Sequence, residues 1–147
     1  MSITADQRTA TPISIYFYFD HDGDWEHVTI IVNSDGTIGV VWFSAHEGGQ
    51  WTVPEMQDTH PVVYVALGSH GSYPTAGQQH RSDPYPDDET GEGTRVMPPV
   101  IETGERRDPR PGQEWIRYAG LWGELGRTKR SSAPYGPGHH PSWRAGV

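Results

Sequence analysis

The chain has 147 residues, of which 33% are hydrophobic, and it carries a formal net charge of −8 and no cysteine. The acidity argues against nucleic acid as a partner, since binding phosphates requires a basic surface, and the lack of cysteine excludes disulfides, thiolate ligands and thiolate nucleophiles. No apolar run reaches the ~18 residues needed to span a bilayer, and residues 1–14 lack the pattern of a secretion signal. We therefore expect a soluble, cytoplasmic protein without a transmembrane segment.

Short β-strands are expected in the first half of the chain. Residues 1–12 are polar and predict an N-terminal tail, and residues 13–19 ("ISIYFYF") are β-branched and aromatic, which predicts a first strand. Residues 28–32 ("VTIIV") and 37–43 ("TIGVVWF") predict two more strands, and "NSDG" between them indicates a hairpin turn. The apolar run 61–68 ("PVVYVALG") is short enough to be a buried strand.

The second half is richer in glycine, proline and charge. Residues 77–112 predict a long loop or mobile flap, because so long a segment without a hydrophobic pattern is uncommon unless it is functional or disordered. Residues 114–125 ("EWIRYAGLWGEL") predict a last strand or a short helix, and Trp143 is expected to dock on the body of the domain. With 18 Gly and 13 Pro disfavouring helices, we predict one mostly-β domain over residues 13–147, an antiparallel β-sandwich with long Gly/Pro-rich loops.

The stretch "HDGDWEH" follows the first predicted strand and concentrates groups that bind metals. Alternation along the next strand places Asp24 and Glu26 on one face at the strand's open end, where two carboxylates repel unless a cation or a shared proton offsets their charge. With His21 they form H-x-x-D-x-E, a donor set that suits Mg²⁺, Ca²⁺, Mn²⁺ or Zn²⁺. Asp20 and Asp22 are further ligands or supporting groups. The alternative is that "DHDGD" is an ordinary turn.

Two more histidines follow apolar strands. His46 lies in "FSAHEGGQW" and His70 in "ALGSHGSYP", so both are expected at strand ends, where they converge with the first cluster if their strands are neighbours. Imidazole changes charge near neutral pH, which suits both histidines to general acid–base catalysis. Asp22 and His27 are expected to act as orienting neighbours of these catalytic groups.

The same stretches resemble a known family. "HDGDWEHV" resembles the HEGDWEHV signature of the Vps62-like family, and "HPVVYVALGSHGSYPTAG" and "AGLWGE…GPGHHPSW" are similar to that family's other two blocks. More distantly, H-x-x-D-W-E followed by S-A-H-x-G-G is similar to the necrosis-inducing (NPP1 or NLP) proteins, which are β-sandwiches that hold a divalent cation. This resemblance implies His21, Asp24 and Glu26 as ligands. The position of that family's additional aspartate falls here on Ile13.

Three functions remain open. The first is a metal-dependent enzyme that hydrolyses, eliminates or cyclises a small molecule, with aromatic side chains lining its pocket unless they are simply core (Trp42, Trp51, Tyr64, Tyr73). The second is a module that binds a glycan or lipid headgroup through the cation, as the distant resemblance implies. The third is a cation with a purely structural role. The enzyme is the leading hypothesis, and site geometry must decide among the three.

Overall fold

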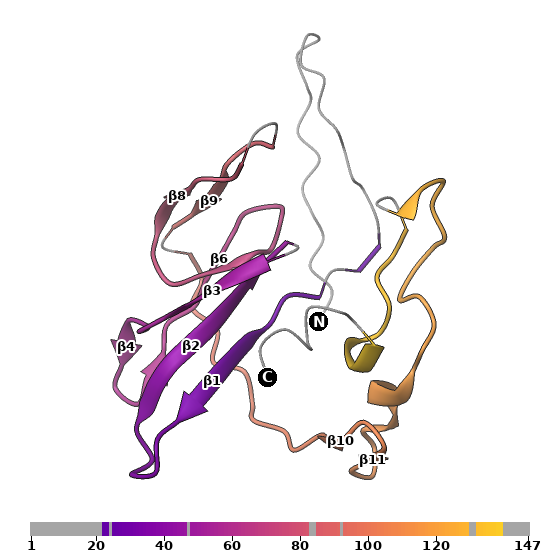
Figure 1. Ribbon diagram of the computed structural model, residues 1–147, viewed down its shortest axis with the longest axis horizontal. Coiled ribbons are helices and arrows are strands. Elements are labelled where there is room, and N and C mark those ends of the chain that lie inside the picture. Colours follow the sequence, from indigo (N-terminus) through magenta and orange to yellow (C-terminus); the bar gives the residue numbers. More distant parts are fainter. Residues whose placement is uncertain are drawn as a thin grey trace, which may run out of the picture.

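The structure, a computed structural model, describes residues 22–23, 25–46, 48–82, 85–91, 93–129 and 132–139. Within these residues the chain consists of short antiparallel strands and two 3₁₀ helices (Figure 1), which confirms the predicted mostly-β class. The predicted sandwich stays a prediction, and the predicted strand over residues 13–19 and Trp143 lie outside the described residues. None of the helices in the described part of the chain has the length and hydropathy that crossing a bilayer requires.

The elements pair locally along the chain. They are β1 (Val28–Val32), β2 (Ile38–Ala45), β3 (Gly48–Thr52), β4 (Met56–Gln57), β5 (His60–Pro61), β6 (Tyr64–Val65), β7 (Ser72–Tyr73), β8 (Gly77–Gln79), β9 (Asp88–Thr90), β10 (Gly104–Glu105), β11 (Asp108–Pro109), η1 (Glu114–Arg117) and η3 (Pro137–His139). Strands β1, β2 and β3 form one three-stranded sheet. Each of the pairs β4–β5, β6–β7, β8–β9 and β10–β11 forms a two-stranded sheet.

The predicted hairpin between β1 and β2 is confirmed. The strands pair with Val28 opposite Phe43, and the turn between them follows from its residue types. Gly36 adopts a φ of +83°, which glycine tolerates because it has no Cβ. The side chain of Asp35 accepts a hydrogen bond from the backbone N–H of Thr37 at 2.9 Å, the local bonding that makes aspartate a frequent turn residue.

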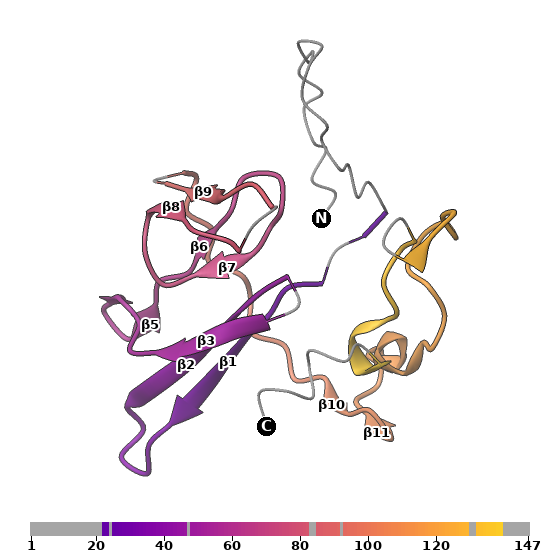
Figure 2. The same ribbon diagram turned by 45° about the horizontal axis from the view of Figure 1, so that its top comes forward.

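The core of the described residues lies under β2. Val41 and Phe43 are fully buried on one face of this strand, as expected from the alternation of side chains across a sheet. Ala66 and Tyr73, beside and within β6 and β7, are also buried, and β7 contacts β2 (Figure 2). The end of β2 is therefore held against the β6–β7 hairpin, which is where the site residues converge.

The prediction of one buried strand over residues 61–68 is wrong. This stretch contributes the end of β5 at Pro61 and the two-residue strand β6, and Leu67 is 86% exposed. Proline has no backbone N–H to donate to a sheet. Directly after β6 the chain turns, with the N–H of Ala66 donating to the carbonyl of Gly71 at 2.9 Å. This apolar stretch therefore ends one strand pairing and begins a tight hairpin, and it does not form a continuous buried strand.

Short elements interrupt the predicted loop over residues 77–112. Strands β8 and β9 form a hairpin at its start, β10 and β11 form another at its end, and residues 93–103 between them have no regular secondary structure. After it, Glu114–Arg117 forms the 3₁₀ helix η1, so the short helix expected within residues 114–125 is present and the alternative of a strand is not. Figure 1 shows this C-terminal part, in orange and yellow, beside the strands of the first half.

An aromatic cluster joins the start of β1 to the C-terminal part. The ring of Trp25 stacks on Trp115 with centroids 6.4 Å apart and meets Trp122 edge-on at 5.0 Å. Tyr118 packs against Trp122 at 6.0 Å. Aromatic pairs in these arrangements stabilise a fold beyond the area that they bury. The segment leading into β1 is thus held through the Trp25 ring by Trp115 and Trp122, which lie about a hundred positions later in the chain.

Candidate functional site

Glu26 is held in place where the β1–β2 pairing ends. One oxygen of its carboxylate, Oε2, accepts a hydrogen bond from the Ser44 hydroxyl at 2.5 Å, and Oε1 accepts one from the backbone N–H of His46 at 2.9 Å. Ser44 is fully buried, and its Oγ accepts a further bond from the N–H of His27 at 2.7 Å. The carboxylate is therefore oriented by β2 itself.

His46 directly follows β2 and reaches across to β9. Its Nε2 lies 2.7 Å from Oδ2 of Asp88, and the exposed fractions of the two side chains are 25% and 6%. Its backbone has a φ of +57°, a left-handed conformation that costs energy in a non-glycine residue and is frequent at functional sites. Because a carboxylate only accepts, we assign the Nε2 proton to His46, which leaves Nδ1 as the basic nitrogen.

Asp88 is the centre of this cluster. The Tyr73 hydroxyl donates to the same oxygen, Oδ2, at 2.5 Å. Burial pushes the pKa of Asp88 upward, but the hydrogen bonds from Tyr73 and His46 outweigh it and leave the pKa below its usual value. The Ser69 hydroxyl acts in the same direction from nearby, although it forms no hydrogen bond of standard geometry with any described residue. Asp88 is thus an ionised carboxylate in a buried position.

Tyr73 stays protonated over the physiological range. Burial, followed by the hydrogen bond and the negative charge of Asp88, raises the pKa of the Tyr73 phenol well above its ordinary value. A protonated phenol is a permanent donor, so Tyr73 holds the same carboxylate oxygen of Asp88 that His46 contacts. We assign Tyr73 a positioning role on Asp88.

A glycine allows the strands to approach closely around this cluster. A Cβ at Gly71 would lie 3.1 Å from the Tyr73 ring, 3.2 Å from Cβ of Ala45 and 3.4 Å from Oδ2 of Asp88. The first two distances are tighter than ordinary contacts, so a side chain here would displace β7 from the end of β2. Gly71 therefore keeps the Asp88 carboxylate within reach of His46.

The remaining predicted catalytic residues are His27, His70 and Asp22. His27 is half-buried beside Ser44, and its carbonyl also accepts the Ser44 N–H at 3.0 Å, so its backbone helps to orient the Glu26 partner. His70 occupies the turn after β6 with a φ of +62°, next to Ser69. Asp22 is exposed and accepts a hydrogen bond from the N–H of Glu124 at 3.2 Å.

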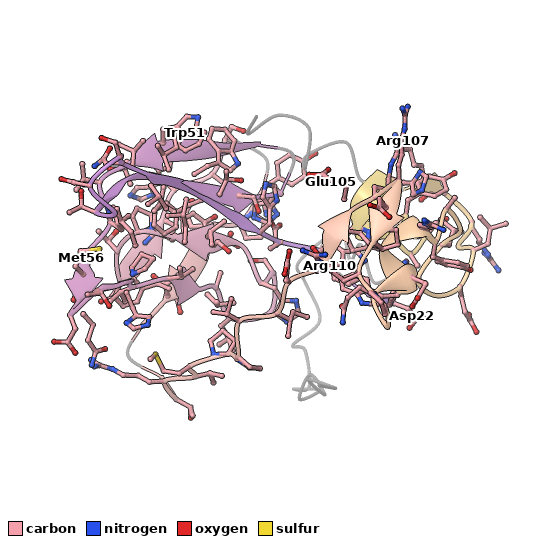
Figure 3. The ribbon with its side chains drawn as sticks, turned by 90° about the horizontal axis from the view of Figure 1, so that it is seen from below. Asp22, Trp51, Met56, Glu105, Arg107 and Arg110 are labelled. Carbon is pink, nitrogen blue, oxygen red and sulfur yellow. The ribbon has the colours of Figure 1, made fainter. Side chains whose placement is uncertain are left out.

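The structure therefore places Asp22 on the C-terminal segment and not at the His46 imidazole. Figure 3 shows the labelled Asp22 on the opposite side of the molecule from Trp51 and Met56. A Cβ at Gly123 would lie 2.2 Å from Cβ of Asp22, so the two segments are in close contact. Its observed role is docking the segment before β1.

Most of the predicted metal ligands lie outside the residues that the structure describes. His21, Asp24 and Asp20 lie outside the described residues, and among the residues that are described no three His, Asp or Glu side chains are arranged to hold a metal ion. Glu26 is the described member of the set. Its Oε2 accepts a hydrogen bond from the Ser44 hydroxyl and its Oε1 one from the N–H of His46, and hydrogen bonds of this kind also orient carboxylates that bind metals. Its role as a metal ligand stays a prediction.

Asp88 and Ser44 are the site residues that sequence reasoning missed. Asp88 lies in the segment predicted as a loop, and "DDE" does not distinguish it from Asp87. In the folded chain the two neighbours point to opposite sides: Asp87 binds His80 Nδ1 at 2.8 Å, whereas Asp88 is buried against His46. Ser44 differs, because it directly follows the apolar strand predicted over residues 37–43, and a hydroxyl that continues such a strand is a signal that could have marked it.

Comparison with known proteins supports the resemblance to the Vps62-like family that the sequence motifs indicated. The family model of vacuolar protein sorting-associated protein 62 matches residues 10–84. The chain is 25% identical over 138 residues to Vacuolar protein sorting-associated protein 62 of Saccharomyces cerevisiae, covering 71% of this chain and 29% of that protein. It is 24% identical over 141 residues to TDA6 of the same yeast, a protein assigned provisionally to vacuolar protein sorting, covering 71% of this chain and 30% of TDA6.

The chain thus spans less than a third of the length of either yeast relative. No solved structure matches it. The distant likeness to the necrosis-inducing proteins stays a prediction. The matched region contains Glu26, Ser44, His46 and Tyr73, whereas Asp88 follows it. With half of its residues matched by the family model, the chain belongs to the vacuolar protein sorting-associated protein 62 family.

Proposed function

We propose that this chain is a divalent-cation-dependent enzyme in which His46 transfers a proton to or from a small molecule. The observation that carries the proposal is the 2.7 Å contact between His46 Nε2 and the buried carboxylate of Asp88. A histidine held on one nitrogen by an ionised carboxylate is fixed in tautomer and orientation, and it presents its other nitrogen to a substrate.

The proton steps follow from this arrangement. Nδ1 of His46 accepts a proton from a water molecule or from the substrate, and the negative charge of Asp88 stabilises the imidazolium that forms. Tyr73 donates to Asp88 throughout, because its raised pKa keeps the phenol protonated. The imidazolium then returns the proton to a leaving group. Hydrolysis, elimination and cyclisation all use this pair of transfers.

The proposed cation ligands are Glu26 with His21, Asp24 and Asp20. A divalent ion bound there would supply Lewis acidity or lower the pKa of a bound water. What supports its placement next to His46 is the Glu26 carboxylate, which accepts the N–H of His46 itself. The predicted cation ligand and the predicted proton-transfer group are thus hydrogen-bonded neighbours at the end of β2.

A second candidate is a module that binds a glycan or lipid headgroup through the cation. The observation in its favour is Trp51, which is 40% exposed and lies 5.6 Å from the ring of Trp42. Exposed indoles stack on apolar ring faces. The names of the two yeast relatives refer to vacuolar protein sorting, and this chain spans less than a third of either relative. A role of this chain in vacuolar protein sorting is therefore a proposal.

Turnover measurements separate the two candidates. The full chain is assayed against a panel of small esters, lactones and β-elimination substrates with Mg²⁺, Mn²⁺, Ca²⁺ or Zn²⁺ and with EDTA. We expect His46→Ala to abolish turnover while cation affinity, measured by calorimetry, is retained. His60→Ala, a change at a histidine of β5, is the matched control. Turnover that survives His46→Ala contradicts the proposal that His46 is the catalytic group of an enzyme. Cation-dependent capture of glycans or liposomes without turnover favours the binding module.

A further inference from the structure

Arg81 is a half-buried cation whose guanidinium forms no ion pair with any carboxylate in the part of the chain that the structure describes. It follows strand β8, and its guanidinium carbon lies 4.9 Å from the centre of the Tyr85 ring. Asp87 accepts the backbone N–H of Arg81 at 2.9 Å, and among the described residues no carboxylate forms an ion pair with the guanidinium. A cation–π contact of this kind orients the side chain without neutralising it.

The β8–β9 hairpin places Arg81 close to Asp88. Gln79 pairs directly with Asp88, and directly paired residues project to the same face of an antiparallel hairpin. Arg81 lies two positions after Gln79, and its backbone N–H donates to the side chain of Asp87, the residue directly before Asp88. Its positive charge partly offsets the rise in the pKa of Tyr73 that burial and Asp88 cause, so it acts on the phenol that binds Asp88.

Arg81 is not needed to balance the buried aspartate. The groups that keep Asp88 ionised are Tyr73, His46 and Ser69. A guanidinium offers a planar set of donors that matches a carboxylate or phosphate, and removing it partly from water is costly unless an anion compensates. The guanidinium is therefore available to a bound anion beside the acid–base site.

We infer that Arg81 binds an anionic group, a carboxylate or a phosphate, of the molecule on which His46 acts, and so selects an anionic substrate. The inference deepens the proposed function and rests on it for the reaction, whereas anion binding is measurable without any turnover. Arg81 is then a specificity-determining residue and His46 the group that moves the proton.

The test titrates inorganic phosphate, and separately acetate, into the ¹⁵N-labelled full chain without added metal. The readout is the chemical shift of the amides of His46, Tyr73 and Asp88. We expect saturable shifts at these residues, and roughly tenfold weaker binding in Arg81→Gln, because a charge-assisted hydrogen bond is lost. The anion that binds with the higher affinity indicates whether the substrate's charged group is a phosphate or a carboxylate.

Arg95→Gln is the matched control, since Arg95 bonds to Gln57 on the exposed β4, and it should leave the affinity unchanged. Arg81→Lys, which keeps the charge but loses the planar fork, should fall between wild type and Arg81→Gln. Absence of shifts at these amides in the wild type with both anions, or equal affinity in Arg81→Gln, overturns the inference. Turnover that survives His46→Ala overturns the proposed catalytic function but does not affect anion binding at Arg81. Failure of the proposed function and failure of the anion-binding inference are therefore distinguishable.

Discussion

The imidazole of His46 and the carboxylate of Asp88 are separated by 42 positions in the chain and meet at 2.7 Å in the fold. The contact joins the residue after β2 to the first residue of β9. Asp88 is also held by Tyr73 from β7, so three separate elements contribute to one hydrogen-bonded group. Such a network is strongly dependent on each partner, because the low dielectric of a buried site makes an unpaired charge costly.

Replacing Tyr73 with phenylalanine removes one donor to Asp88 and nothing else of comparable size. We expect the free energy of unfolding to fall by about 1.5–3 kcal/mol, the usual cost of a lost hydrogen bond to a charged group. Urea denaturation measures the change. Tyr64→Phe is the control, because the Tyr64 hydroxyl donates to exposed Glu55 at 2.8 Å and its loss should cost much less. Equal effects of the two changes would show that the Asp88 network contributes no special stability.

The lowered pKa of Asp88 makes stability depend on pH in a defined direction. The folded state binds the proton less readily than the unfolded chain, whose aspartates have a pKa near 3.9. The contribution of ionised Asp88 is therefore complete above that value and is lost as pH falls through the lower folded pKa. We expect the stability difference between wild type and Asp88→Asn to shrink as the pH falls below about 5.

Denaturation curves at several pH values measure this difference. Asp108→Asn, a change at an exposed carboxylate of β11, should show little dependence on pH relative to the wild type. A difference between wild type and Asp88→Asn that stays constant down to about pH 3 would mean that the folded and unfolded pKa values of Asp88 coincide.

Gly123 tests the docking of the segment before β1. Because a Cβ there would lie 2.2 Å from Cβ of Asp22, we expect Gly123→Ala to push the two segments apart and to cost about 1–3 kcal/mol, as overpacking does. Trp25 rests on Trp115 and Trp122 in the same region, so tryptophan fluorescence should change as well. Gly91→Ala meets no atom within 4 Å and is the control. Unchanged stability and fluorescence in Gly123→Ala would contradict this contact.

Local signals in the sequence account for the parts of the fold that were predicted. The turn residues of "NSDG" determine the β1–β2 hairpin within a few positions of the chain, and apolar strands preceding His46 indicated a strand-end site. The partner of His46 could not be predicted, because the choice between Asp87 and Asp88 depends on which of the two side chains points to His46 in the fold. Pairing over 42 positions is a tertiary property that no local pattern encodes.

The same limit explains the error over residues 61–68. Hydrophobic runs of this length are ambiguous, because a short apolar stretch occurs both in a buried strand and in a tight hairpin. Pro61 ends one pairing, and β6 turns at Ala66 into β7. That turn also contains Ser69, whose hydroxyl helps to lower the pKa of Asp88, so a segment that was predicted as a buried strand positions part of the candidate site.

Paramagnetic broadening by Mn²⁺ tests the central claim, that one site contains both a divalent cation and the His46 imidazole. Substoichiometric Mn²⁺ is added to the ¹⁵N-labelled full chain, and the ring signals of His46 are followed against those of His60 on β5. We expect the His46 signals to broaden first, and Glu26→Gln to abolish this selectivity while Glu105→Gln does not. Broadening of His46 and His60 alike, or selective broadening that persists in Glu26→Gln, would contradict the account.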